Sequence, residues 1–302
     1  MSNAISLMRG CIKQGMEPGE ALTAVNGELA RNNPNNMFIT AFIACVDLAH
    51  GGIRYANAGH NDPHILFDGK IQTISGASGL PLGLFEEEHY ETAEETLPLG
   101  STLFLHTDGV NEAVNKDKEF FGTVRLEKTL IGSGGIHAVE CVKDALDRFT
   151  AGAEQSDDIT MLSCTTRAEV MELRAEAAEF KKIKEWIFAD PGIPEGEKKK
   201  LCLSAEECFV NICSYAYEKE GGTVTVHKQC APDGRVSLQM TDRGAPFDQT
   251  KDIIDPEEYD MEEQIGGLGR LLARSQSDVF RYHNIGGSNV LMMIKNGKEA
   301  LS

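Results

Sequence analysis

Apolar and polar positions change their spacing along the chain, and this change divides it into two regions. The first region opens with helical spacing at residues 4–15 and 18–31, then turns to β-branched and aromatic runs separated by short turns. We therefore expect antiparallel strands with flanking helices, and a hairpin turn at Asp68-Gly69. The predicted strands and hairpins are 37–48, 52–59, 64–74, 101–110 and 157–166, and the later helices are 125–132 and 136–150.

The second region starts near Glu169 and has a different order of patterns. Residues 172–188 carry apolar side chains at helical spacing and predict one helix, and residues 197–217 predict a longer one. Strands, an acidic segment at 250–264, a short helix and a final hairpin follow. Their predicted ranges are 223–230 and 235–242 for the strands, 268–275 for the helix and 278–295 for the hairpin. The patterns thus predict two domains, 1–167 and 168–302.

Length and charge agree with two domains and narrow the classes of partner. A chain of 302 residues fits two domains of about 150 residues each. Its net charge is 29 minus 47, or −18, and both regions are acidic. Without a basic cluster, a nucleic acid or an anionic membrane surface is not the expected main partner. No apolar run is long enough for a membrane span, and the eight cysteines form no CxxC, which favours reduced thiols in a cytoplasmic location.

Carboxylates in the first region cluster where strands begin or end. Asp108 lies in HTDGV at the end of one predicted strand, and Asp157 and Asp158 lie in QSDDIT before another. Strand ends hold side chains firmly, and carboxylate oxygens are the ligands that Mg²⁺ and Mn²⁺ prefer. Two such ions can activate a water and neutralise a phosphoryl group. The alternative is that these aspartates serve only as turn residues.

Six motifs follow one another in order along the first region. They are MFITAFIACVD, YANAGHNDPHIL, GLPLGLF, LFLHTDGVNEA, EFFG and QSDDITML. This series resembles the SpoIIE-type branch of the metal-dependent (PPM) serine/threonine phosphatases, over roughly residues 4–165. The resemblance implies an α+β fold, in which an α-β-β-α sandwich holds Mn²⁺ or Mg²⁺ at one edge of its two sheets. It also implies that Asp108 and Asp157 are metal ligands and that Asp158 belongs to the same metal site, where it orients Asp157. His60 is expected to be structural rather than catalytic.

One departure from that family concerns the start of the domain. The family's bridging aspartate lies just upstream of the first helix, whereas residues 1–46 contain no aspartate. We therefore expect the first strands and the ligand shared by both metals to be missing, and phosphatase activity from this chain to be little or none. Either the chain is a fragment of a longer gene product, or its phosphatase half is inactive.

Three polar segments carry the chemistry of the second region. Glu207 and Asn211 are spaced i, i+4 and share one helix face, where the carboxylate can act as a base and the amide can bind Mg²⁺. MTDRGAPFD at 240–248 places an aspartate at a strand end before a glycine, and IGGLGR at 265–270 offers backbone N–H groups at a helix start. Taken singly, each segment is more typical of a solvated helix face or a turn than of a binding site.

In this order the three segments resemble the GHKL ATP-binding fold, a Bergerat-type α/β sandwich, and in particular the RsbW-type anti-sigma-factor serine kinases. The match covers about residues 169–297. The resemblance implies that Asn211 holds Mg²⁺, that Glu207 is the catalytic base, and that Asp242 reads the adenine of ATP. It further implies that Gly244 lies beside the adenine and that Gly267 and Gly269 belong to a phosphate lid, whose flexible part is 250–264.

Two residues depart from the RsbW-type pattern. Tyr215 replaces the histidine common in the relatives' helix, and Arg270 follows the glycines where an apolar residue is usual. Neither belongs to the expected core ATP ligands. A basic residue of the domain's first helix, Lys181 or Lys182, is a weaker candidate for contact with the γ-phosphate.

The two resemblances together imply a bifunctional regulator of a sigma factor. The leading hypothesis is an ATP-dependent protein serine kinase that acts on a STAS-domain anti-sigma antagonist, joined to a serine/threonine phosphatase for the same phosphoprotein. The alternative is a non-catalytic module that binds a sigma factor or STAS partner, with ATP as a structural ligand and the first domain as a degenerate scaffold. A homodimer is an expectation from relatives of the second domain.

Overall fold

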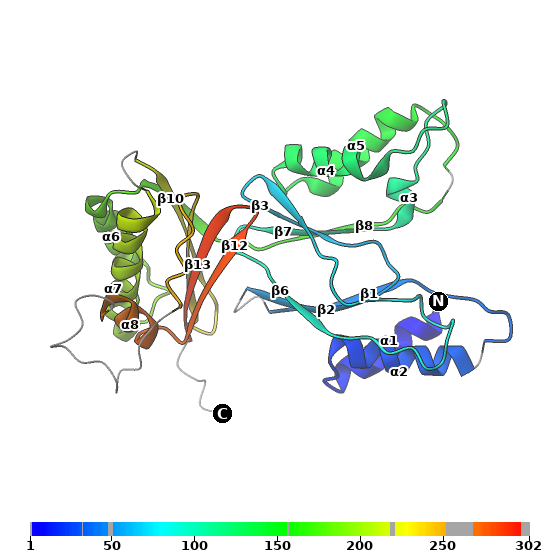
Figure 1. Cartoon of the computed structure of the whole chain (residues 1–302), viewed down its shortest axis with the longest axis horizontal. Helices are drawn as coiled ribbons and strands as arrows, with labels where there is room; N and C mark the ends of the chain where they lie inside the picture. Colours follow the sequence, from blue (N-terminus) through cyan, green and yellow to red (C-terminus); the bar gives the residue numbers. More distant parts are fainter. Residues whose placement is uncertain are drawn as a thin grey trace. The chain divides into compact units, whose positions relative to one another are not determined.

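The computed structural model describes residues 2–31, 33–47, 51–155, 157–217, 221–251 and 268–296. The chain divides into two compact units (Figure 1). Unit 1 comprises Met1–Leu97 and Ser101–Thr166, and unit 2 comprises Pro98–Gly100 and Arg167–Ser302. In the described part of the chain, no helix is both long and apolar enough to cross a membrane.

Unit 1 contains two four-stranded sheets. In the first, the order is β1-β2-β5, and β6 also pairs with β2; in the second, the order is β4-β3-β7-β8. The first sheet consists of β1 (Ala41–Asp47), β2 (Gly52–Ala58), β5 (Ser78–Gly79) and β6 (Ala93–Thr96). The second consists of β3 (His64–Phe67), β4 (Lys70–Thr73), β7 (Thr102–His106) and β8 (Met161–Thr165). Asp68 and Gly69 join β3 to β4 with φ of 51° and 72°, the left-handed pair that a two-residue hairpin requires.

Helices cover the outer face of each sheet in unit 1 (Figure 1). They are α1 (Ser2–Lys13) and α2 (Pro18–Arg31) on the first sheet, and α4 (Gly122–Ser133) and α5 (Ala138–Thr150) on the second, with the short α3 (Asp108–Asn111) directly after β7. Side chains alternate between the two faces of a strand. Consequently, Leu103 packs between the sheets, whereas the adjacent Phe104 packs against α4 and α5. The three apolar layers confirm the predicted α-β-β-α sandwich.

Unit 2 is one antiparallel sheet with helices packed on one face. The strand order is β12-β13-β11-β10-β9. The strands are β9 (Glu169–Arg174), β10 (Thr223–Cys230), β11 (Val236–Asp242), β12 (Val279–Ile285) and β13 (Ser288–Lys295). The helices are η1 (Ala177–Glu179), α6 (Phe180–Ala189), α7 (Glu195–Asn211), the π-helical turn η2 (Ile212–Ala216) and α8 (Leu268–Ser275). A single core joins them, with Ile183, Phe209 and Met240 fully buried.

The prediction of one helix over 172–188 is wrong at its beginning. Residues Glu169–Arg174 form the edge strand β9, which pairs with β10, and the α-helix starts only at Phe180. Leu173 is buried, whereas its neighbours Glu172 and Arg174 are exposed, which is the alternation of a strand. Pairing with β10 and burial of Leu173 therefore override the helical preference of this Glu- and Ala-rich stretch.

Candidate functional site

The structure brings the two acidic segments of unit 1 together at one edge of the second sheet. Thr107, at the end of β7, donates its backbone N–H to the carbonyl of Thr160 (3.0 Å) and its hydroxyl to the carbonyl of Asp158 (3.1 Å). Gly109 lies so close that a side chain there would overlap the Asp158 carbonyl. The start of α3 is thus in direct contact with the segment that contains Asp157 and Asp158.

The carboxylates at this edge accept hydrogen bonds within their own turns. Asp108 Oδ1 accepts from the Gly109 N–H (3.0 Å), and Asp157 Oδ1 accepts from the Asp158 N–H (2.7 Å). Within the described residues, no group of three or more His, Cys, Asp or Glu side chains is arranged to hold a metal ion. These residues therefore do not fit a complete two-metal centre. The roles of Asp108, Asp157 and Asp158 as ligands stay predictions.

The NAGHN turn stands next to this edge and is held by Asn57. Its amide oxygen accepts from the His60 N–H (2.8 Å), and its Nδ2 donates to the His60 carbonyl (2.9 Å). Burial lowers the pKa of His60, and the nearby Asp108 carboxylate opposes that shift. His60 is therefore a neutral imidazole near Asp108, held in place by the geometry of a turn.

A hollow of about 330 Å³ opens beside Asp108. Its lining residues are Asn61, Asp62, His64, Thr73, His106, Asp108, Asn111, Glu112 and Thr123. His64 and His106 stack with ring centroids 5.7 Å apart, and Asn111 Nδ2 donates to His106 Nε2 (3.1 Å). Burial lowers the pKa of both histidines, that of His106 to about 4, so both rings are neutral near pH 7. The sequence analysis missed these two histidines. The sequence feature that could have indicated them is one histidine in each of two apolar strands, His64 in β3 and His106 in β7.

In unit 2, Asp242 ends β11 as a buried carboxylate that is 5% exposed. Its Oδ1 accepts from Asn289 Nδ2 on β13 and from the Gly244 N–H, both at 2.9 Å. Burial raises the pKa of Asp242, and these two hydrogen bonds partly oppose the rise. Because both bonds use Oδ1, the other oxygen can accept from a ligand.

Asp242 lies in the wall of a small, mostly apolar pocket. The wall consists of Ile212, Ala216, Asp242, Ala245, Phe247, Gln249, Tyr282, Asn289 and Leu291. A side chain at Gly244 would overlap the Ala216 carbonyl, so only glycine allows this loop to approach η2 so closely. Apolar walls with one carboxylate match the chemistry of a flat heteroaromatic ring that donates a single hydrogen bond, but the free volume of about 10 Å³ admits such a ring only after the walls move apart. The sequence analysis missed Asn289 and Gln249.

The end of α7 presents Glu207 and Asn211 one turn apart, and η2 follows at once. Asn211 Nδ2 donates to Gln249 Oε1 (3.0 Å), and Gln249 Nε2 donates to the Cys208 carbonyl (3.3 Å). This orientation of the amide leaves Asn211 Oδ1 as the atom that can bind a cation. A single π turn inside an α-helix is frequent at functional sites.

Gly269, in the first turn of α8, contacts Glu207. A side chain at this position would overlap Glu207 Oε2, so the flexible end of the Glu207 side chain would have to move aside. The structure thus joins two residues that the sequence analysis predicted separately. Gly267 and residues 252–264 of the expected lid lie outside the described residues. The two lysine candidates on α6 form ion pairs with their own helix and with η1, Lys181 with Glu185 and Lys182 with Glu179.

Comparisons with known proteins give a family for each unit. Residues 1–167 match the family described as Stage II sporulation protein E (SpoIIE), and residues 170–295 match the histidine kinase-like ATPase domain. Among individual proteins, the chain is similar to Protein IcfG of Synechocystis sp., with 33% identity over 129 residues, which is 42% of this chain and 20% of IcfG.

Two further proteins are similar to it. Phosphoserine phosphatase RsbU of Bacillus subtilis is 28% identical over 152 residues, which is 49% of this chain and 45% of RsbU. The chain therefore spans less than half the length of these curated relatives. The crystal structure of the RsbU and RsbW domains of Rv1364c from Mycobacterium tuberculosis aligns with 98% of this chain and 81% of that chain, at 20% identity and a TM-score of 0.48.

The family matches cover the chain in the order that the motifs predicted. The SpoIIE match spans more than half of the chain and coincides with the α-β-β-α sandwich, and the ATPase match coincides with the sheet that carries Asp242. The chain belongs to the stage II sporulation protein E family, and it carries a histidine kinase-like ATPase domain after its phosphatase-type domain.

Proposed function

We propose that this chain is a partner-switching regulator. In it, unit 2 uses Mg²⁺ and ATP to phosphorylate a serine of a STAS-domain anti-sigma antagonist, and unit 1 is a phosphatase domain directed at the same phosphoprotein. The observation that carries the proposal is the buried Asp242 carboxylate, which Asn289 and Gly244 orient in an apolar pocket of a histidine kinase-like ATPase domain. The similarity of unit 1 to Phosphoserine phosphatase RsbU supports the phosphatase half.

Each polar residue of the unit 2 site has a role in this proposal. The free oxygen of Asp242 accepts from the adenine amino group, and Asn211 Oδ1 binds Mg²⁺, which neutralises charge on the phosphates when it is bound. Glu207 accepts the proton of the substrate serine hydroxyl as the serine oxygen bonds to the γ-phosphorus, and the bond from that phosphorus to the β–γ bridging oxygen breaks, so that ADP leaves. The N-terminal turn of α8, at Gly269, lies against Glu207 and can donate backbone N–H groups to the phosphates.

The proposed role of unit 1 is more restricted. Asp108 and Asp157 are the proposed ligands of Mn²⁺ or Mg²⁺, and Asp158 supports its neighbour. Because the described residues supply no cluster of three ligands, we expect little or no phosphate release from this chain. Incubation with a phosphorylated STAS protein and Mn²⁺ tests this expectation, and robust release would mean that other residues complete the site.

The kinase proposal is tested by phosphate transfer from γ-labelled ATP to purified STAS-domain proteins of the same genome, with the site located by mass spectrometry. Transfer to a serine that is lost in Glu207→Ala supports the proposal. Nucleotide binding without transfer to any of them would favour the alternative, a module that sequesters a STAS protein or a sigma factor with ATP as a structural ligand.

A further inference from the structure

The two residues by which unit 2 departs from the RsbW-type pattern contact the same aromatic ring. Tyr215 belongs to η2, and its ring centroid lies 5.0 Å from that of Phe247. Arg270 belongs to the first turn of α8, and its guanidinium carbon lies 6.0 Å from the centroid of the Phe247 ring. Aromatic pairs and arginine–aromatic pairs at such distances attract one another. Two departures that are far apart in sequence therefore converge on one side chain.

Phe247 is part of the wall of the pocket that contains Asp242. Tyr215 is 62% exposed, so its ring packs on Phe247 at the surface of the unit rather than in its core. An isolated phenylalanine at the rim of a pocket can change rotamer or move with its loop. A phenylalanine with contacts to a ring and to a guanidinium loses that freedom.

Arg270 also holds the loop that carries Phe247. Its Nη1 donates to the Lys251 carbonyl (3.1 Å). Within this loop, Asp248 Oδ1 accepts from both the backbone N–H (2.9 Å) and the hydroxyl (2.6 Å) of Thr250. The same loop bears Gln249, which fixes the amide of Asn211. Arg270 thus contacts Phe247 in the pocket wall and holds the loop whose Gln249 orients Asn211, the expected Mg²⁺ ligand.

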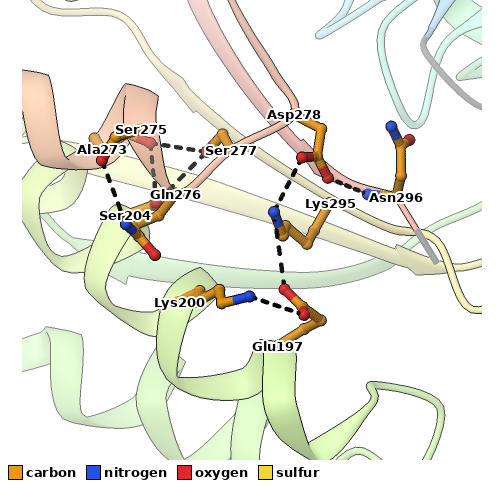
Figure 2. Close-up of polar contacts among 10 residues, drawn as sticks. All are labelled: Glu197, Lys200, Ser204, Ala273, Ser275, Gln276, Ser277, Asp278, Lys295 and Asn296. Carbon is orange, nitrogen blue, oxygen red and sulfur yellow. Dashed lines mark hydrogen bonds and ion pairs between the residues drawn. The ribbon is translucent and has the colours of Figure 1, made fainter. Parts of the chain in front are cut away.

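The other end of α8 is anchored independently of Arg270, as Figure 2 shows. Ser204 on α7 donates its hydroxyl to the carbonyl of Ala273 (3.0 Å), and Ser277 donates to the same carbonyl (2.9 Å). Beyond the helix, Asp278 pairs with Lys295 of β13 at 3.0 Å. Because α8 is attached to α7 and, through the residue Asp278 beyond its end, to the sheet, the position of Arg270 in its first turn is fixed.

We propose that Arg270 and Tyr215 are positioning residues that hold Phe247 and its loop against the nucleotide pocket and thereby slow the release of a bound adenine nucleotide. The inference rests on the proposed nucleotide binding of unit 2. The removal of either contact should act on dissociation, because it loosens a wall of the pocket without removing a group that reads the base.

The test measures the dissociation rate of the fluorescent nucleotide mant-ADP with Mg²⁺ from the full chain. We expect Arg270→Leu and Tyr215→Ala each to release mant-ADP about five to ten times faster. Tyr215→Phe keeps the ring and should match the parent. Arg274→Leu is the matched control, because Arg274 is an exposed residue of the same helix, one turn further on.

A double-mutant cycle separates positioning from a general loss of stability. Arg270→Leu should add little to the effect of Phe247→Ala on release, and the thermal midpoint of the nucleotide-free variants should stay near that of the parent. Rates for Arg270→Leu within twofold of the parent, or effects that add fully in the cycle, would overturn the inference while leaving nucleotide binding intact. If the parent fails to bind mant-ADP, the proposed function of unit 2 fails, and this inference fails with it.

Discussion

The acidic edge of unit 1 and the pocket of unit 2 differ in where their polar groups find partners. At the edge, Asp108 and Asp157 accept from the backbone of the next residue. In the pocket, Asp242 accepts from β13, and Asn211 donates to a loop that follows β11. Tertiary contacts therefore help to position the polar groups of the pocket, whereas, in the described part of the chain, the Asp108 and Asp157 carboxylates are held only by the residues that follow them.

Burial explains this difference. A buried carboxylate must be hydrogen-bonded, because an unpaired polar group in an apolar environment is costly. Asp242 is buried and has partners from separate elements. Asp157 and Asp158 are exposed, so water satisfies them and nothing in the fold has to fix them. The free volume of the pocket is only about 10 Å³, so its walls must move apart to admit a nucleotide base, although Asp242 is already oriented. At the edge of unit 1, ligand binding has to order the exposed carboxylates themselves.

The largest effect should come from Glu207→Gln, which keeps the shape of the side chain but removes the base. Phosphate transfer to the STAS substrate should fall by about 10²- to 10⁴-fold, the usual contribution of general base catalysis. Nucleotide affinity should change by no more than about threefold, since Asp242 and Phe247 are untouched. Glu206→Gln, at the exposed neighbouring position on α7, is the control. Unchanged transfer in Glu207→Gln would refute the assignment of the base.

A smaller effect is expected for Asp242→Asn. The amide can still accept from Asn289 and Gly244, but its NH₂ group faces the adenine amino group, a donor that then lacks an acceptor. Nucleotide affinity, measured by calorimetry, should fall roughly 10- to 100-fold, the cost of one unsatisfied buried polar group. Asp108→Asn, the same change at the edge of unit 1, should leave that affinity unchanged. Equal losses in both variants would contradict the independence of the two sites.

Sequence patterns predicted local structure and the site residues that lie close together in sequence. The ranges expected for β10 and α8 agree with the structure residue by residue, and the hairpin expected over 278–295 contains β12 and β13, because each element has a clear period and is bounded by turn residues. Glu207 and Asn211 could be paired because a helix places i and i+4 on one face. The contact of Gly269 with Glu207 could not be predicted, because it depends on how α8 packs against α7.

Residues whose role depends on tertiary partners escaped the sequence analysis. The strand β9 exists because β10 offers it an edge, and its own residues favour a helix. In the sequence, Asn289 is a polar residue in a largely apolar strand with no evident partner. Its role is visible only in the fold, where β11 pairs with β13 and Asn289 donates to Asp242. His64 and His106 each look incidental in the sequence, and only the pairing of β3 with β7 stacks them.

Addition of Mn²⁺ should have a weaker effect than addition of nucleotide. If the described ligands bind Mn²⁺ with a dissociation constant near 1 mM, then 1 mM Mn²⁺ stabilises unit 1 by only about 0.4 kcal/mol. Asp108→Asn should abolish this increment, which differential scanning calorimetry with and without Mn²⁺ measures. Stabilisation by several kcal/mol in the parent would mean that further ligands complete the edge and would remove the contrast with unit 2.

The smallest effect concerns the pH dependence of stability, and it follows from the burial of Asp242. Burial raises the pKa of this carboxyl above its ordinary value of 3.8. The stability that the protonated form contributes is therefore fully present below about pH 4 and is lost as the pH rises through the higher pKa of the folded state. The pKa shift of Asp190 has the opposite sign to that of Asp242. Burial raises the pKa of Asp190, but hydrogen bonds from Lys228 and the Gly192 N–H outweigh burial and lower it.

Asp242→Asn isolates the Asp242 contribution, because Asp190 is unchanged in both proteins and its contribution cancels in their difference. The nucleotide-free variant should gain stability relative to the parent as the pH rises from about 4 to 7, measured by urea unfolding at fixed ionic strength. The same substitution that weakens nucleotide binding should thus not weaken the fold at neutral pH. A stability difference that does not vary with pH would mean that Asp242 is ionised as readily in the pocket as in the unfolded chain, and that the pocket is less dry than its contacts indicate.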